Sequence, residues 1–531
     1  MRKSGDVGPE LTRRRFLAAG GLAVVGAAGI GAVILEACSS STSTPGASGA
    51  AGPNTAAAAG SAAPVARRTY KSRPDLSAPP VAVASPVGSV APGLVFLTPN
   101  NGKAPDGLLM ADNTGKPVWI RPDTGSYAAN FRPSVYNGKP VLTWWEGATN
   151  GGYGSGQLVI VDDTYTEVLR IGAGQGRKAD IHEFQITPQQ TALLLTDQGV
   201  PIPAGSTPPP FQNWDCIVVE LDIQTGAVLF EWHSADHIDP SESVLPAPGA
   251  AGSPIPTATP FSAPTPGGSA AAPSIPVYDS VHANAIELDT DGHLLVSARN
   301  TSTIYKVDRS TGNILWRLGG KKSDFKMGAG TSFGLQHDPR RHADGTLSIF
   351  DDGTTGPSRG IVLDVDEVAM TATLVKEYPH PHGKFAMSQG NMEILPNGNV
   401  FVGWGSTGTA SEFTTDGQLE FDADFSGSIQ SYRCFRYPWV GQPKEAPVAI
   451  ADTPSNGMTN VYASWNGATE VVTWEVLGGT DATSLSSLGT FPRTDFETVL
   501  AVKAASGMIA VNALDQGGAV LGTSKAVSIP D

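Results

Sequence analysis

One phrase recurs along most of this chain and limits the folds that the chain can adopt. It consists of an apolar run, an acidic or polar turn that often contains Thr-Gly or Asp-Gly, and a second run that ends near an aromatic residue. Copies begin at Leu108, Leu158, Ile217, Ile304, Ile361 and Ser411. Such a pattern is typical of a β-hairpin, because alternation with period two marks a strand and the turn residues tolerate positive φ.

A further pair of strands is expected ahead of each of these hairpins. Four of these pairs begin at Ile181, Val281, Gln336 and Gly390. A strand pair followed by a hairpin makes a four-stranded antiparallel unit, which is the blade of a β-propeller. Six such units fit between about residues 93 and 428, at the roughly 40 to 50 residues that a blade needs. The sequence therefore predicts an all-β protein with a six-bladed β-propeller over residues 93–446, and an array of β-sandwiches is the alternative.

Polar residues open the first strand of several units. Because the first strand of each blade lines the central channel, these side chains are expected to converge although they lie far apart in the sequence. The convergent candidates are His182, His282, Asn284 and His337, with Gln389 and Asn391 in the same register. Gln389 and Asn391 are interpreted as hydrogen-bonding fillers between blades. Arg299 ends the second strand of the unit that contains His282.

Several phrases resemble the PAPS-independent arylsulfotransferases, in particular the arylsulfotransferase-like proteins of actinobacteria and fungi. The similar phrases lie between His182 and Pro443 and are "HEFQIT", "SVHANAIELDTDGHLLVSARNTSTIYKVDRSTGNILWRLGG", "FGLQHDPR", "LSIFDDG", "MEILPNGNVFVGWGS" and "YRCFRYPWVGQP". The resemblance implies a six-bladed propeller. It also implies transfer of a sulfuryl group from a phenolic sulfate ester to another phenol through a sulfated histidine, with no nucleotide cofactor and no metal.

The resemblance also implies roles for individual residues. His337 matches the histidine that becomes sulfated, and His182 matches a further channel histidine. His282, Asn284 and Arg299 match the group that binds the sulfuryl oxygens. The N-terminal β-sandwich that supports dimerisation in the enteric enzymes is missing, so the oligomeric state and the range of phenols remain open.

The residue types suit this chemistry on physical grounds. A neutral imidazole is both a nucleophile and a leaving group, so it can carry a transferable group. Sulfuryl transfer, like phosphoryl transfer, places charge on equatorial oxygens, which a planar Arg299 fork and the donors of Asn284 and His282 can bind. A second histidine can protonate the departing phenoxide and deprotonate the acceptor.

Two other classes of function remain open. Three converging histidines can hold Zn²⁺ with an open position, which would make the protein a metal-dependent hydrolase or lyase. A propeller on a surface lipoprotein can also be a non-catalytic binding platform. Each residue has a structural alternative as well: Arg299 can pair with Asp308, and Asp338 can orient His337.

The N-terminus has the features of a bacterial export signal. Arg13 and Arg14 precede a small-residue apolar run that ends in "LEAC", so residues 1–38 are interpreted as a twin-arginine lipoprotein signal with lipidation at Cys38. A membrane anchor is the alternative reading of the same run. Residues 39–92, rich in Ala, Ser, Gly and Pro, are expected to form a disordered tether. We therefore expect the protein on the outer face of the bacterial cytoplasmic membrane or in the cell envelope.

The remaining features complete the expected organisation. Residues 447–531 alternate cleanly and predict a small β-sandwich of the immunoglobulin or fibronectin kind, in which Trp465 and Trp474 lie on two strands joined by an Asn-Gly turn. Two proline-rich runs, near 201–210 and 239–277, are interpreted as loop insertions. Cys216 and Cys434 are expected to be buried thiols, although pairing is open. The net charge is -15 and no basic run follows the N-terminus, so nucleic acid is not an expected partner.

Overall fold

Short antiparallel strands form nearly all the regular structure. The computed structural model describes residues 66–530, apart from residues 85–87, 103, 105, 151, 202–211, 247–276, 354–355 and 505. The predicted export signal, Cys38, most of the predicted tether and most of both proline-rich runs lie outside the described residues. Among the residues that are described, no helix has the length and apolar character needed to cross a membrane.

Six sheets of four or five strands lie between residues 82 and 437 of the described chain. The first contains, in spatial order, β31 (Phe435–Tyr437), β4 (Leu94–Leu97), β6 (Leu108–Ala111) and β7 (Pro117–Arg121). The second contains β8 (Tyr127–Tyr136), β9 (Lys139–Asn150), β10 (Tyr153–Val161) and β11 (Glu167–Ile171). The third contains β12 (Phe184–Ile186), β13 (Thr191–Pro201), β14 (Gln212–Asp222) and β15 (Val228–His233), with β16 (Val277–Tyr278) on β14.

The other three sheets repeat this arrangement. The fourth contains β17 (Ala283–Leu288), β18 (Leu294–Ala298), β19 (Thr303–Val307) and β20 (Ile314–Gly319). The fifth contains β22 (His337–Arg341), β23 (Leu347–Asp351), β24 (Arg359–Asp366), β25 (Thr371–Pro379) and β21 (Lys326–Met327). The sixth contains β26 (Asn391–Ile394), β27 (Val400–Gly403), β28 (Thr409–Phe413), β29 (Leu419–Asp424) and β3 (Ala82–Val83).

Minor elements complete the description of this region. They are the pairs β1 (Arg68–Thr69) with β2 (Ser77–Ala78) and β5 (Pro99–Asn100) with β30 (Gln430–Ser431), helix α1 (Ser234–His237), and the 3-10 turns η1 (Pro240–Glu242) and η2 (Gly405–Thr407). All six hairpins predicted from the sequence have two paired strands at the expected residues.

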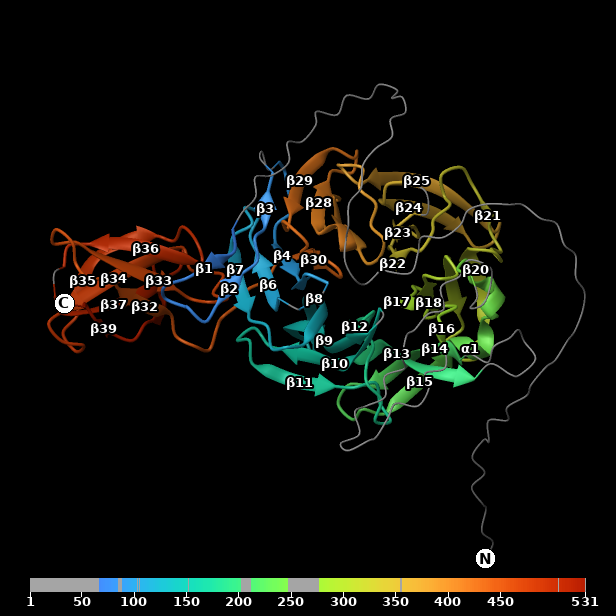
Figure 1. Ribbon diagram of the computed structural model, residues 1–531, viewed down its shortest axis with the longest axis horizontal. Helices are drawn as coiled ribbons and strands as arrows, with labels where there is room; N and C mark the ends of the chain where they lie inside the picture. The colour runs from blue at the N-terminus through green and yellow to red at the C-terminus, as the bar shows by residue number, and fades with distance from the viewer. Residues whose placement is uncertain are drawn as a thin grey trace, which may run out of the picture. The chain divides into compact units, whose positions relative to one another are not determined.

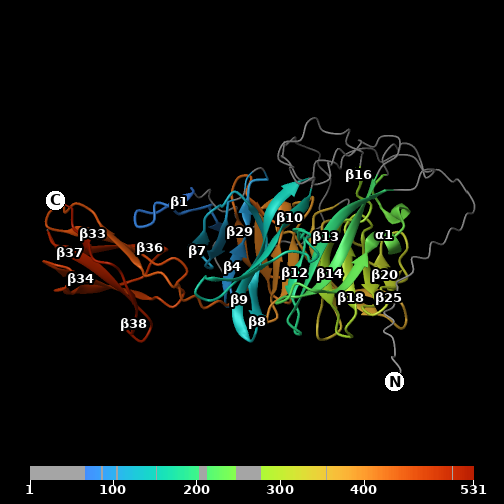
Figure 2. The ribbon, with the colours of Figure 1, turned by 90° about the horizontal axis from the view of Figure 1, so that it is seen from below.

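The inner strands of neighbouring sheets contact one another in a closed circuit. Strand β8 contacts β12, β13 contacts β17, β17 contacts β22, β22 contacts β26, and β31 contacts both β27 and β8. Figure 1 shows β8, β12, β17 and β22 toward the centre of these sheets, and Figure 2, in which β8 and β12 are labelled, shows the sheets from below. This is a propeller-like, all-β arrangement in which the first strands bring their ends together.

The circuit is closed by a strand that the repeat pattern did not reveal. Strand β31 follows the sixth sheet in the sequence but pairs with β4 of the first sheet. Asn391 holds this strand, because its Nδ2 donates to the carbonyl of Cys434 at 2.7 Å and its Oδ1 accepts from the Cys434 N–H at 2.9 Å. The side chain of Asn391 is therefore structural.

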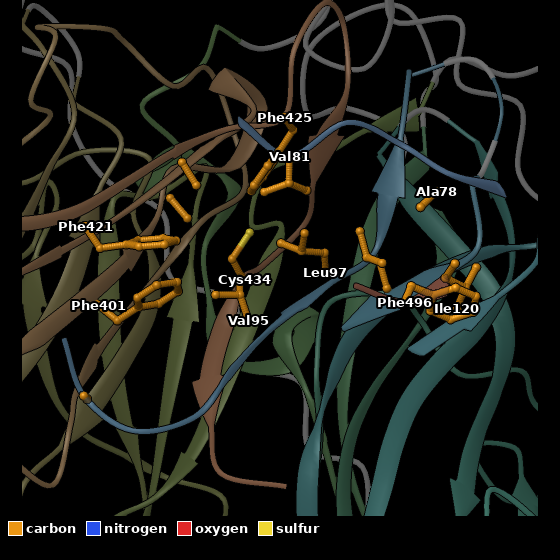
Figure 3. Close-up of a cluster of buried hydrophobic side chains, with 14 of the residues drawn as sticks. Ala78, Val81, Val95, Leu97, Ile120, Phe401, Phe421, Phe425, Cys434 and Phe496 are labelled. Carbon is orange, nitrogen blue, oxygen red and sulfur yellow. The ribbon is translucent and has the colours of Figure 1, made fainter. Parts of the chain in front are cut away.

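The prediction that the tether extends to residue 92 is wrong for its last part. Strand β3 pairs with β29, and Tyr70, Leu76 and Val81 are buried. Val81 belongs to the same hydrophobic cluster as Phe421 and Phe425 (Figure 3). The average composition of this stretch is poor in large apolar residues, but the few that it contains are buried, which stabilises its ordered form.

The C-terminal residues form two sheets that share one hydrophobic core. One sheet contains β32 (Val448–Ala451), β33 (Thr459–Ser464) and β36 (Glu497–Val502). The other contains β35 (Ser486–Pro492), β34 (Thr473–Gly479), β37 (Met508–Leu514) and β38 (Val520–Thr523), with β39 (Val527–Ser528) on β37. Val461 of the first sheet and Trp474 and Val511 of the second lie in the same buried cluster.

The Asn-Gly turn of this region differs from the expectation. Trp465 follows β33 and Trp474 lies in β34, and these strands belong to different sheets instead of forming one hairpin. Asn466 accepts a hydrogen bond from the Ile120 N–H and donates to the Ile120 carbonyl, each at 2.8 Å. Gly467 has a φ of 89° and lies against the ring of Tyr165, where a β-carbon would overlap the ring. The turn therefore attaches the C-terminal sheets to β7.

The two cysteines of the described chain are unpaired. Cys216 and Cys434 are both free and buried, as the sequence suggested. Cys216 lies in β14 and Cys434 immediately before β31, in separate hydrophobic clusters, so each packs as a small apolar side chain.

Candidate functional site

Three histidines meet where the inner strands begin. His182 lies two residues before β12, His282 lies immediately before β17, and His337 is the first residue of β22. The imidazole centres of His182 and His282 are 4.8 Å apart. The ring of Tyr432 lies 5.6 Å from that of His182 and 6.4 Å from that of His337. The structure thus brings together three residues that are 155 positions apart at most, and all three are buried.

Each of these histidines is oriented by a carboxyl group at its Nδ1. His282 Nδ1 lies 2.6 Å from Asp279 Oδ2, and His337 Nδ1 lies 2.6 Å from Asp352 Oδ2. His182 Nδ1 makes the same kind of contact with Asp180. Because Nδ1 is occupied in every ring, Nε2 is the nitrogen that is left for chemistry.

Asp338 is not the partner of His337, although it is the next residue. Asp338 has a φ of 52°, and its carboxylate contacts Arg340 and lies 3.4 Å from Arg433. The carboxyl group beside His337 comes from Asp352, after the end of β23. Because the chain turns at Asp338, the side chain of His337 contacts Asp352, whereas the side chain of Asp338 contacts the arginines.

The tautomer of His337 follows from its two contacts. The backbone N–H of Gln389 can only donate, and it lies 3.2 Å from His337 Nε2, so Nε2 carries a lone pair and Nδ1 carries the proton. Burial, followed by the positive charge of Arg299, holds the pKa of His337 well below its usual value. Burial also raises the pKa of Asp352 well above its usual value. His337 is therefore a neutral imidazole, the form that acts as a nucleophile.

His282 is built into the same site by its backbone. It has a φ of 53°, and its carbonyl accepts a hydrogen bond from the Arg299 N–H at 2.9 Å. Burial lowers the pKa of His282, and the nearby Asp279 only partly offsets this effect. The hydroxyl of Tyr153 donates to the other oxygen of Asp279, and the Tyr153 ring lies 4.9 Å from that of His282.

Arg299 supplies a cation that no carboxylate neutralises directly. Its guanidinium donates to Asn300 Oδ1 and to the Met387 carbonyl, each at 2.9 Å, and it makes no ion pair within the described part of the chain. The alternative pair with Asp308 is not present, since the Asp308 carboxylate accepts hydrogen bonds within its own exposed turn. A buried cation without a counter-ion favours binding of an anion.

Asn284 connects two inner strands beside the histidines. One N–H of its amide donates to the carbonyl of Gln336, the residue before His337, at 2.7 Å. The amide oxygen is buried and has no hydrogen-bond partner among the described residues. Asn284 thus positions the start of β22 and has one amide N–H left over for a ligand.

A buried charge network lies one residue further along the inner strands. The carboxylate of Glu183 pairs with three arginines. Its Oε2 lies 2.7 Å from Arg340 Nη2, and its Oε1 lies 3.2 Å from Arg433 Nη1 and 3.3 Å from Arg132 Nη2. Burial alone would raise the pKa of Glu183, but the three arginines outweigh it and lower the pKa to about 2. This network joins strands of different sheets and fixes the backbone on which the histidines stand.

A cavity of about 340 Å³ lies further along the same strands, and none of the three histidines lines it. Its walls include Arg132, Phe184, Arg340, Glu393 and Tyr437. Burial raises the pKa of Glu393 to about 7. Both arginines of this cavity are paired with Glu183, whereas Arg299, beside the histidines, has no ion-pair partner in the described part of the chain.

The chain matches one known protein family over the region that contains the site. Residues 132–426, more than half of the chain, match the family model of the arylsulfotransferases (ASST). The chain belongs to the arylsulfotransferase family. The match includes all three histidines, their carboxyl partners and Arg299, and this protein is an arylsulfotransferase-like enzyme.

Other comparisons add little to the family assignment. No curated protein matches the chain. A Bacteroides caccae protein of unknown function aligns at 12% identity over 65% of this chain and 99% of its own, with a TM-score of 0.38. A virginiamycin B lyase from Staphylococcus aureus aligns at 10% identity over 73% of this chain and 96% of its own, with a TM-score of 0.32. Similarities of this size carry no argument about the arylsulfotransferase.

Several residues of the site were missed from the sequence. The oriented carboxyl groups of Asp180 and Asp279 precede their histidines by two and three positions, a spacing that the sequence does display. Asp352 and the aromatic residues Tyr153 and Tyr432 have no such local signal, because they are not close in the sequence to the histidines that they contact. Among the residues that the structure describes, no group of three or more His, Cys, Asp or Glu side chains is arranged to hold a metal ion.

Proposed function

We propose that this enzyme transfers a sulfuryl group from an aryl sulfate ester to a phenol, with His337 as the covalent carrier, in the channel of a six-bladed β-propeller. The observation that supports the proposal most strongly is the state of His337. It is a buried neutral imidazole whose Nδ1 faces Asp352 and whose Nε2 carries a lone pair, and the unpaired cation Arg299 lowers its pKa. The proposed nucleophile, His337, and the cation proposed to bind the sulfate, Arg299, therefore lie in the same site.

In the first half of the reaction, His337 Nε2 forms a bond to sulfur while the bond between sulfur and the aryl oxygen breaks. The electron pair of that bond leaves with the phenoxide, which takes up a proton from His182. The imidazole ring of sulfo-His337 becomes positively charged, and Asp352 stabilises it through Nδ1–H. The sulfuryl oxygens accept hydrogen bonds from Arg299, with His282 and Asn284 as further donors.

In the second half, a phenol replaces the first product. His182 takes the proton of the acceptor hydroxyl, the phenolic oxygen bonds to sulfur, and the bond between sulfur and Nε2 breaks, which restores neutral His337. His182 suits both steps because Asp180, although buried, has a pKa lowered by His182 and can hold an imidazolium. No nucleotide and no metal takes part in this scheme.

The direct test is a screen with chromogenic aryl sulfates. We expect release of the coloured phenol to depend on a second phenol, with the sulfate recovered on the acceptor. Activity that a chelator removes and zinc restores would support the metal-dependent alternative. Failure of every aryl sulfate to react would favour a non-catalytic binding propeller.

The remaining parts of the chain have proposed roles as well. Residues 447–531 form a β-sandwich that serves attachment or packing, because its contacts with β7 lie away from the histidines. We place the enzyme on the outer face of the bacterial cytoplasmic membrane, exported by the twin-arginine route and lipidated at Cys38. Mass spectrometry of the mature N-terminus tests this placement, and an unmodified first residue other than Cys38 would refute lipidation.

A further inference from the structure

One short segment occupies both reactive groups of the site. The N–H of Gln389 donates to His337 Nε2 at 3.2 Å, and the carbonyl of Met387 accepts from the Arg299 guanidinium at 2.9 Å. The lone pair that receives the Gln389 N–H is the one that must attack sulfur. The sulfur atom of a donor would therefore have to lie where this N–H now lies.

We propose that residues 387–389 form a gate that seals the nucleophile and is opened by the sulfate group of the donor. This inference rests on the proposed function, since it assigns His337 Nε2 as the attacking atom. When the gate opens, sulfate oxygens replace the Met387 carbonyl on Arg299, and the Gln389 N–H leaves the imidazole lone pair. A sulfate anion can make this exchange, whereas a neutral phenol offers no comparable acceptor for the arginine.

The closed gate contains features that favour its opening. Gln389 has a φ of 72°, a conformation that is strained for a residue other than glycine, and its buried side-chain oxygen has no partner among the described residues. The next residue, Gly390, has a φ of 105° and lies against the ring of Phe350, where a β-carbon would clash. Strain and an unmet acceptor raise the free energy of the closed state, which brings the open state within a few kcal/mol while the closed state remains the more populated one.

Ser406 makes two hydrogen bonds that hold the gate against η2, the turn between β27 and β28. Ser406 Oγ accepts a hydrogen bond from the Met387 N–H at 2.9 Å, and the Ser406 N–H donates to the Ser388 carbonyl at 3.1 Å. Ser406 lies in η2, and within the described chain its side chain makes no hydrogen bond to His337 or Arg299. Met387 itself is 40% exposed, so the segment has room to move outward.

Ser406→Ala tests the gate, because it removes one hydrogen bond from the closed state and leaves the reacting groups intact. We expect the KM for an aryl sulfate to fall roughly fivefold, the factor that one ordinary hydrogen bond contributes, with kcat unchanged. Sulfation of His337 at low donor concentration should accelerate by the same factor. Thr407→Ala is the matched control, since Thr407 lies in the same turn and bonds to Trp404 and Thr409 instead of the gate.

A second measurement does not depend on turnover. Inorganic sulfate should accelerate hydrogen–deuterium exchange in the peptide that contains residues 385–389, and it should do so at a lower concentration in Ser406→Ala than in the wild type. Equal KM values, labelling rates and sulfate-dependent exchange in the two proteins would overturn the gate. If wild-type His337 is never sulfated, the proposed function fails, and the exchange measurement alone then decides whether sulfate moves the segment.

Discussion

The carboxyl group of Asp352 is expected to stabilise the charged form of the carrier histidine. Its Oδ2 lies 2.6 Å from His337 Nδ1, and Asp352→Asn would keep a hydrogen-bond acceptor there while removing the negative charge. When Nε2 bonds to sulfur, the ring becomes positive and its charge centre lies roughly 4 Å from that of the carboxylate. At an effective dielectric constant of about 20, this attraction is about 4 kcal/mol, which corresponds to roughly a thousandfold in rate.

Part of this attraction is spent on ionising the carboxyl group, because burial raises the pKa of Asp352. We therefore expect Asp352→Asn to slow the sulfation of His337 by about two to three orders of magnitude. Rapid-quench mass spectrometry of the His337 peptide measures that rate. Asp344→Asn is the matched control, because Asp344 carries the same charge in the exposed turn at the far end of the same strand pair. Sulfation at the wild-type rate in Asp352→Asn would show that no positive ring forms.

Three further changes have defined outcomes. Arg299→Lys keeps the charge but loses the planar guanidinium that would donate to two sulfuryl oxygens at once and that Asn300 positions, so kcat/KM in the aryl sulfate assay should fall by roughly one to three orders of magnitude. Asn391→Ala leaves the buried N–H and carbonyl of Cys434 unpaired. It should lower the free energy of unfolding in urea by about 2 to 5 kcal/mol. An unchanged midpoint of urea unfolding would mean that other contacts hold β31 in place. Asp215 and Glu231 raise the pKa of His233 to about 9. The wild type should therefore be more stable than His233→Gln by about 1 kcal/mol below pH 6.5, and this difference should disappear as the pH rises through 9.

The strands and the histidine cluster could be predicted because both follow from periodic patterns. A hairpin has a local signal, namely alternation on both sides of a turn, and all six repeated hairpins predicted in this way are present. The exception is the Asn-Gly turn of the C-terminal region, because β33 and β34 on either side of it lie in different sheets. His182, His282 and His337 stand at equivalent positions of repeated units, so any arrangement that repeats the unit brings them together. The position of a residue within a repeated unit therefore predicts where that residue lies in the fold.

The rest of the site depends on contacts that the repeated pattern does not specify. Strand β31 is only three residues long, too short to show alternation, and its partner β4 lies about 340 positions earlier. Asp352 reaches His337 from the following strand, whereas Asp338 appears better placed in the sequence but turns toward the arginines. Tyr70, Leu76 and Val81 were obscured by the Ala- and Pro-rich residues around them. Such contacts are set by side-chain packing within and between sheets, which a local pattern does not record.

The central claim is that His337 carries the sulfuryl group, and trapping that intermediate tests it most directly. The wild-type enzyme is incubated with an aryl sulfate and no acceptor, digested, and analysed by tandem mass spectrometry. We predict the mass of one SO₃ on His337, its removal when a phenol is added, and neither label nor transfer in His337→Asn. A label on another residue, or transfer by His337→Asn at a rate near that of the wild type, would contradict the account.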